Sequence, residues 1–197
     1  MSEMENRWTR RDLKIALIGG FLLFFVYMIG AFWELLVTRD MCMFFMIGYL
    51  MSTVVVTAIM MTKRFGMGIL VFVPYALIGL PLEYYMEWIL DPVLISPFAA
   101  IIWSLIGPVV GLSADLTHRF IPKAVHARIR GIITGLVIAA VHFVVMLGAL
   151  AFLYVNPLPG LEHYLNALGF TLPWLLMNGA FGGYTAYALS RDLSASS

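Results

Sequence analysis

The chain has 197 residues, of which 62% are hydrophobic and 12% charged, with a net charge of +1 and a mean hydropathy of +0.94. A soluble domain of this length does not need so apolar a composition for its core, so we expect a multi-span membrane protein without a sizeable soluble domain. The single cysteine, Cys42, excludes an internal disulfide and a cysteine metal cluster. We expect no metal, no cofactor and no nucleic-acid partner.

The apolar runs predict an all-α membrane protein that forms a single domain over residues 1–197. The first run begins after a cluster of basic residues but has no small-residue cleavage site at its end, so we interpret it as a retained span. Pro74 and Pro81 interrupt the third run, and Pro97 and Pro108 the fourth. The six predicted transmembrane helices cover approximately residues 14–36, 41–61, 66–90, 93–112, 131–155 and 170–189.

The positions of lysine and arginine predict the orientation. With the N-terminus inside, eleven of the twelve basic residues fall on the cytoplasmic side and only Arg39 lies outside. Six spans then place both termini in the cytoplasm, and the distinctly basic loop from Asp115 to Arg130 lies on the same side. We therefore expect a multi-pass protein of the cell membrane, in contact with the lipid bilayer.

The outer ends of spans one and three combine carboxylates with aromatic rings. Glu83 and Glu87 are four residues apart, so a helix places both on one face, with Tyr84 stacked on Trp88 beside them. Trp33 and Glu34 close span one. Such a cluster suits a flat, cationic or hydrogen-bonding ligand. The alternative is an ordinary aromatic belt at the membrane boundary with solvated acids, which we favour for Tyr85 and Trp88.

Two later spans carry polar side chains at membrane depth. His142 lies near the middle of span five and must face another helix or a cavity, either as a structural histidine or as a ligand contact. In span six, Trp174 and Asn178 share one face, and the Asn178 amide needs a partner within the bundle. Gly179, Gly182 and Gly183 favour close helix packing. The candidate binding residues are Trp33, Glu34, Glu83, Tyr84, Glu87, His142, Trp174 and Asn178.

Small residues near the start of span one form a possible docking patch. Ala16 and Gly20 are a small-xxx-small pair with Gly19 beside them, and they allow another helix to approach closely, within this bundle or in a partner subunit. Catalytic and nucleotide-binding motifs are absent from the sequence, so we expect no enzyme activity. Any ATP-driven step would need another chain.

The length, the six spans with both termini inside, the small residues of span one and the ending LPWLLMNGAFGGYTAY resemble the substrate-capture S-components of energy-coupling factor (ECF) vitamin transporters. The resemblance implies that a vitamin or precursor binds near the outer face. It also implies docking on a transmembrane coupling subunit through Ala16, Gly19 and Gly20, with cytoplasmic ATPases in other chains. Thiamine and pyrimidine-precursor binders are nearest in kind, and the eight candidate residues are those that would surround an aromatic, cationic ligand.

A second class of function remains open from the sequence. A non-transporting scaffold or accessory subunit would use its apolar faces and the basic loop to bind another membrane protein or anionic lipid. The two classes differ in one respect: in a carrier, Glu83, His142 and Asn178 converge on one cavity, whereas in a scaffold they face separate neighbours. A small intramembrane enzyme is disfavoured because no catalytic set lies at one depth.

Overall fold

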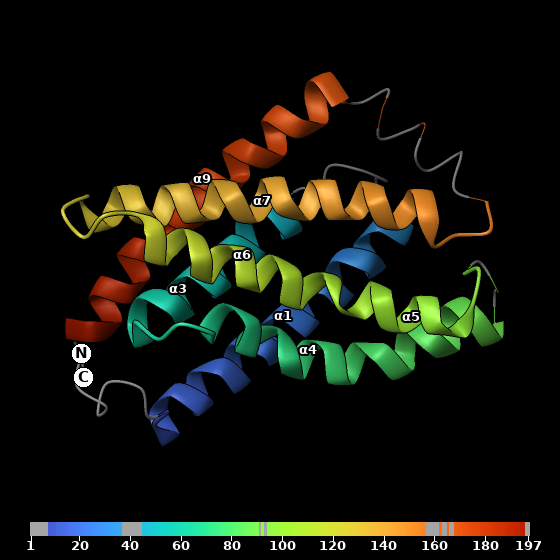
Figure 1. The fold of residues 1–197 in the computed structure, drawn as a ribbon, viewed down its shortest axis with the longest axis horizontal. Coiled ribbons are helices and arrows are strands. Elements are labelled where there is room, and N and C mark those ends of the chain that lie inside the picture. The colour runs from blue at the N-terminus through green and yellow to red at the C-terminus, as the bar shows by residue number, and fades with distance from the viewer. Residues whose placement is uncertain are drawn as a thin grey trace.

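Helices make up nearly all of the chain in this computed structural model, which describes residues 8–36, 45–90, 92, 94–156, 162, 165 and 168–195 (Figure 1). No strand occurs among these residues; one isolated bridge joins Leu94 to Tyr154. The all-α prediction is therefore confirmed for the described residues. The elements are α1 (Arg10–Leu36), η2 (Phe45–Met51), α3 (Ser52–Thr62), α4 (Met67–Glu83), η3 (Tyr84–Leu90), α5 (Pro97–Ser104), α6 (Ile106–Phe120), α7 (Ala127–Phe152) and α9 (Leu168–Ala195).

These elements form six rods that follow the six predicted apolar runs. η2 continues into α3 and α4 into η3, while Leu105 alone separates α5 from α6. Pro97 begins α5 rather than breaking a helix, which suits a residue that lacks a backbone N–H. Among the described residues one helix, α7, is long and apolar enough to cross a membrane, and the shorter segments Gly48–Thr62 and Met67–Leu82 are also apolar.

The predicted basic loop from Asp115 to Arg130 is mostly helical. α6 continues to Phe120 and α7 begins at Ala127, so the connection is only residues 121–126. α6 continues beyond the apolar run and ends where the backbone leaves helical geometry. Ile121 is extended (ψ 124°) because it precedes Pro122, whose ring disfavours a helical conformation in the preceding residue. The sequence analysis had taken the end of apolarity as the end of the helix.

Two segments are wound more widely than the predicted α-helices. η2 and η3 are π-helical over seven residues each, and η3 covers most of the Pro81–Trp88 stretch. Pro81 lacks the N–H that an α-helix needs, and the N–H of Tyr84 is shared between the carbonyls of Leu80 and Pro81. π-helical turns are rare and often occur at functional sites.

The tightest helix contacts are made by glycines, as the small residues of span six predict. α9 crosses α7 obliquely in Figure 1, and at the crossing Gly135 and Gly131 of α7 lie against the backbone of Gly179 and Gly183. A Cβ atom at Gly135 would collide with the carbonyl oxygen of Gly179. Gly68 of α4 and Gly111 of α6 form a second crossing of the same kind. Because glycine has no side chain, the helix backbones can touch at these crossings.

The small residues of α1 also pack inside the chain, which corrects the expected docking surface. Ala16 is only 3% exposed. A Cβ atom on Gly19 would meet the side chain of Val71 in α4, and a Cβ atom on Gly20 would meet the carbonyl oxygen of Val71 and the ring of Pro74. The three small residues therefore pack within the bundle, at the α1–α4 contact. This is one of the two possibilities that the sequence left open, the other being contact with a partner subunit. A partner subunit would not reach these residues without separating the two helices.

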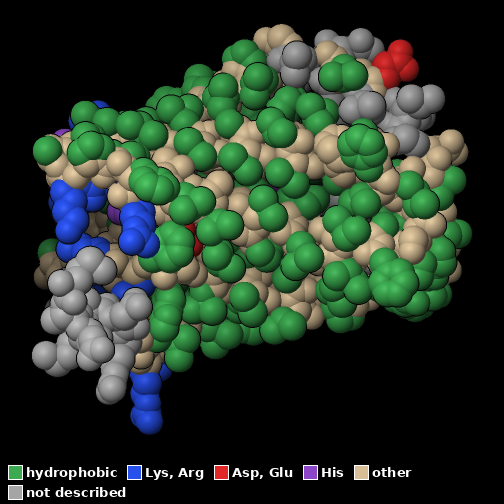
Figure 2. Space-filling model, in the orientation of Figure 1, with side chains coloured by type: hydrophobic (Ala, Val, Ile, Leu, Met, Phe, Trp, Pro, Cys, Tyr) green, Lys and Arg blue, Asp and Glu red, His purple; other side chains and the backbone are tan. Residues whose placement is uncertain are grey.

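Apolar side chains cover the middle of the molecule, and basic ones gather at one end (Figure 2). We call this end the basic end. The start of α1, the α3–α4 and α6–α7 connections and the end of α9 meet there, and together they carry the ten basic residues that the structure describes: Arg10, Arg11, Lys14, Lys63, Arg64, Arg119, Lys123, Arg128, Arg130 and Arg191.

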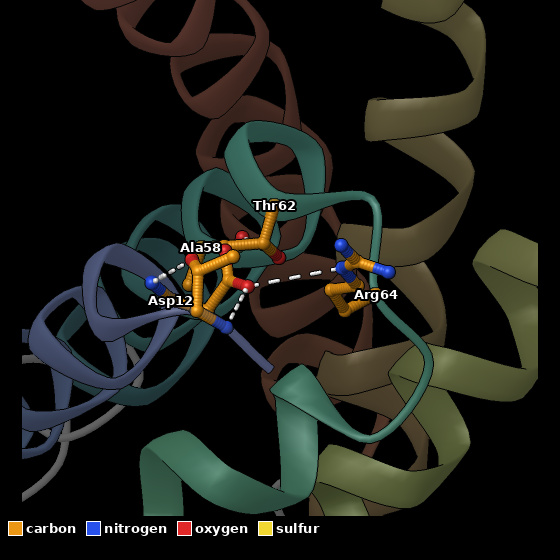
Figure 3. A network of polar contacts seen from close by, with 5 residues as sticks. Asp12, Ala58, Thr62 and Arg64 are labelled. Carbon is orange, nitrogen blue, oxygen red and sulfur yellow. Dashed lines mark hydrogen bonds and ion pairs between the residues drawn. The ribbon is translucent and has the colours of Figure 1, made fainter. Parts of the chain in front are cut away.

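A polar network holds the start of α1 at the basic end (Figure 3). Thr9 and Asp12 form a reciprocal capping box: the Thr9 N–H donates to the Asp12 carboxylate (2.9 Å), and the Asp12 N–H donates to the Thr9 hydroxyl (3.1 Å). Asp12 also pairs with Arg64 at 3.7 Å, which ties the first turn of α1 to the α3–α4 connection.

The crossing of α7 and α9 gives the first testable prediction. Gly135→Ala places a methyl group against the Gly179 carbonyl, so we expect a loss of stability of about 1–3 kcal/mol. Gly148→Ala on the same helix is the control, because its Cβ would have nothing within 4 Å. Thermal melting in detergent measures both. Equal melting temperatures for the two variants would show that the glycine contact does not limit stability.

Candidate functional site

The predicted acid and aromatic cluster lies at the end of the molecule remote from the basic end. Trp33 and Glu34 are in the last turn of α1, and Glu83 ends α4, directly before η3, which contains Glu87. The side chains of these four residues lie outside the described part of the structure. Tyr84, whose side chain is described, is 40% exposed.

Trp88 packs in a small apolar cluster rather than standing free. Its neighbours include Leu94 and Ala99, which are buried, and Tyr154 after the end of α7. The Ile95 N–H donates to the Leu153 carbonyl at 2.9 Å, so the segment before α5 is tied to the end of α7. This arrangement agrees with the structural interpretation of Trp88, as an interfacial aromatic residue that closes the end of the bundle.

On α9, Asn178 is satisfied within its own helix. Its side chain is 6% exposed, and its Nδ2 donates to the carbonyl oxygen of Trp174 at 2.9 Å. Trp174 is half-buried against a cluster formed by Ala139, Phe143 and Leu175. Trp174 therefore lies at the α7–α9 contact. Asn178 instead faces η2, because a Cβ atom on Gly48 would meet the Asn178 Cβ at 2.8 Å, and its amide has a partner without any ligand.

His142 has two buried ring nitrogens without a hydrogen-bond partner, whereas His118 and Arg130 have one such nitrogen each among the described residues. It is 8% exposed, and neither ring nitrogen has a hydrogen-bond partner among the described residues. It lies three residues after Ala139 and seven after Gly135, so it shares the face of α7 that packs on α9. A buried nitrogen without a partner costs about 1–3 kcal/mol, so such a group is unusual in a native structure.

His142 and Trp174 thus lie on two helices that pack against each other, α7 and α9, whereas Asn178 faces η2. Ala139 and Phe143, the neighbours of His142 on its helix, pack with Trp174 and Leu175 of α9. A neutral histidine offers one donor and one acceptor, and an indole ring beside it offers a flat apolar surface. Such a pair can bind a small aromatic molecule that has hydrogen-bonding groups on its edge.

Asp115 is a buried polar residue whose importance the sequence analysis missed. It is 2% exposed and lies on α6, yet its two carboxylate oxygens accept the N–H groups of Gly68 (3.0 Å) and Ile69 (3.2 Å) at the start of α4. It thereby caps a helix to which it does not belong. The available signal was the spacing of four residues between Gly111 and Asp115, which puts the crossing point and the carboxylate on one helix face.

Burial dominates the ionisation of the groups at the basic end. It raises the pKa of Asp115 from 3.8 to about 6, although the backbone N–H groups that it accepts act in the opposite direction. Burial, followed by the charge of Arg130, lowers the pKa of His118 to about 4. His118 is therefore neutral at pH 7, and it does not add to the positive charge of this end.

The described residues contain no group of three or more His, Cys, Asp or Glu side chains that could hold a metal ion. No family model, curated protein or solved structure that we compared with the chain matches it.

Asp115 gives a pH-dependent prediction. Its pKa is higher in the folded than in the unfolded state, so between about pH 4 and pH 6 the folded protein binds more protons and its stability falls as the pH rises. Asp115→Asn keeps one acceptor oxygen and removes this titration. The wild-type melting temperature should therefore fall relative to that of Asp115→Asn across this window. Parallel pH profiles would contradict the assignment.

A second prediction concerns the unsatisfied ring of His142. His142→Leu removes two buried nitrogens without partners, so the melting temperature of the ligand-free protein should stay the same or rise. Asn178→Leu is the control, because it removes a satisfied group and should cost about 0.5–1.5 kcal/mol. If His142→Leu destabilised the protein more than Asn178→Leu, the ring would have a structural partner, and its role as a free ligand group would fail.

Proposed function

We propose that this chain is the membrane-embedded substrate-binding subunit of an ECF-type importer. It would capture a small vitamin or vitamin precursor from outside and pass it to an ATP-driven partner made of other chains. The observation that carries the proposal is His142: a buried histidine with no partner for either ring nitrogen among the described residues, on the face of α7 that packs on α9. Such a group is explained if its partner is a ligand.

The distribution of side chains supports a membrane location with six spans. Six helical rods have an apolar exterior, and the described basic residues gather at the end where the first helix starts and the last one ends (Figures 1 and 2). With that end in the cytoplasm, the proposal places both termini inside and the acid and aromatic cluster outside.

The chemistry of the proposed site favours an aromatic ligand with hydrogen-bonding groups on its edge. His142 supplies one donor and one acceptor, Trp174 supplies a stacking surface, and Glu34, Glu83 and Glu87 supply negative charge at the outer end of the chain. An aminopyrimidine ring meets the first two requirements, and a cationic ring such as that of thiamine would be attracted by the acids. We therefore propose thiamine or its pyrimidine half as the ligand class.

Entry of a ligand would require the outer half of α9 to move. The glycine crossing anchors α9 to α7, while the start of α9 rises away from α7 in Figure 1. We propose that this half of α9 is the movable part. Its displacement would open the contact around His142 and Trp174 without breaking the glycine crossing.

One observation favours the alternative of a scaffold or accessory subunit. Asn178 already has its partner, and α1 presents a run of exposed apolar side chains that a partner helix or lipid would cover: Leu13, Leu17, Ile18, Phe21, Leu22 and Phe25. A scaffold would use this face and would bind no small ligand.

Thermal melting in the presence of vitamins and their precursors tests the proposal. A ligand that binds only the folded protein raises the melting temperature by mass action, by an amount equivalent to about 2.7 kcal/mol at a concentration 100 times its Kd. We expect a saturable rise with one compound of the panel, which includes thiamine and its pyrimidine half. His142→Leu and Glu83→Gln should abolish or weaken this rise.

Glu162→Gln is the matched control, since Glu162 is an exposed acid that the same topology places on the outer side. It should leave the ligand-induced rise unchanged. A flat response of the wild type across the whole panel would reject the capture function and favour the scaffold, and an equal rise in the wild type and His142→Leu would remove His142 from the site.

A further inference from the structure

An apolar groove opens on the surface beside the basic end. It has a volume of about 260 Å³ and lies between the start of α1 and the start of α4, and it is lined by Trp8, Leu13, Gly66, Ile69, Leu70 and Val73. Gly66 has a φ of +92°, which a residue with a side chain rarely adopts, and it forms the turn from which α4 leads away. The groove is open along its length and offers no polar side chain apart from the indole of Trp8.

Basic side chains without partners stand at one end of this groove. Arg10 and Lys14 lie three residues before and one residue after Leu13, on the same exposed face of α1. Arg119 of α6 lies over the ring of Phe65, 5.2 Å from its centroid, directly before Gly66. Apart from this ring contact, the structure gives these three cations no hydrogen bond or ion pair with any described residue.

The acids of the basic end do not neutralise these cations. Asp12 is bound to Thr9 and Arg64, Asp115 caps α4, and Asp192 pairs with Arg191 at 2.9 Å. At this end the described residues supply only these three acids, compared with ten basic residues. Arg10, Lys14 and Arg119 therefore have no acidic partner within the described part of the chain.

We infer that the groove between α1 and α4 is a binding site for an anionic glycerophospholipid, with an acyl chain in the groove and the phosphate at Arg10, Lys14 and Arg119. The observation that carries this assignment is an apolar groove with cations beside one of its ends. That pattern matches the two halves of a lipid. A general excess of cytoplasmic charge accounts for basic residues at this end, but it does not account for an apolar groove that begins among them.

The exposed aromatic residues around the groove agree with this occupant. Trp8 is 41% and Phe65 48% exposed, and both stand where the apolar surface meets the charged end. Aromatic rings favour this depth because one part of the ring contacts chains and the other contacts head groups. The site is separate from the contact between α7 and α9, so it does not depend on the proposed capture function.

Native mass spectrometry of the protein in mild detergent tests the inference. Phosphatidylglycerol and phosphatidylcholine with identical acyl chains are added in equal amounts, and the bound copies of each are counted. We expect preferential retention of phosphatidylglycerol. Arg10→Gln combined with Lys14→Gln should lower this retention by about tenfold or more, since each basic residue near an anionic head group contributes about a factor of five.

Two further variants separate this site from its alternatives. Lys123→Gln combined with Arg191→Gln removes the same charge from the same end but away from the groove, and it should leave the retention unchanged. Val73→Trp, with Val73→Phe as a milder version, fills the groove from an exposed position and should lower the retention of both lipids. Melting curves identify the variants that fold.

Several results would overturn the assignment. Equal losses in the two double variants would indicate a diffuse field rather than a site. Unchanged retention in a folded Val73 variant would show that no acyl chain occupies the groove. Equal retention of the two lipids by the wild type would reject the anionic preference. Competition by glycerophosphoglycerol, the head group without chains, at the same concentration as the lipid would identify a soluble phosphate compound as the occupant.

Discussion

The close approach of helix backbones at paired glycines is the constraint on which the rest of the structure depends. Gly131 and Gly135 of α7 meet Gly183 and Gly179 of α9, and Gly68 of α4 meets Gly111 of α6. In an apolar environment helices gain little from hiding apolar surface, so contact at van der Waals distance supplies much of the attraction. These crossings fix which helix faces meet, including the face of α7 that carries His142.

Close approach also determines how the polar groups are satisfied. The Ser52 hydroxyl donates to the Gly135 carbonyl at 3.3 Å, and the Thr53 hydroxyl contacts the Gly182 carbonyl at the same distance, because no side chain separates these helices. Asp115 reaches the N–H groups of α4 next to the Gly68–Gly111 crossing for the same reason. Against this pattern of locally satisfied groups, both ring nitrogens of His142 lack a partner among the described residues, as do His118 Nδ1 and Arg130 Nε.

The two ends of the molecule have different chemistry. At the basic end, Asp12 and Asp115 are engaged by backbone N–H groups or by Arg64, so within the described part of the chain they leave Arg10 and Lys14 without an acidic partner. At the other end, Glu34, Glu83 and Glu87 occupy positions near the ends of their helices. In the two proposals, a small cationic solute would bind at this end and an anionic lipid at the basic end.

The sequence by itself determined the helical class, the six apolar rods and the separation of charge, because apolar run length and the positions of lysine and arginine are local properties. It also indicated that His142 and Asn178 need partners and that the glycines of span six pack closely. It did not determine that Asn178 bonds to its own helix while His142 does not, or that Ala16, Gly19 and Gly20 face α4. Those outcomes depend on which helix lies opposite. The helical extension of α6 to Phe120 and the capping of α4 by Asp115 were likewise decided by tertiary structure, since a carboxylate 47 residues away satisfies the start of a helix only once the chain has folded.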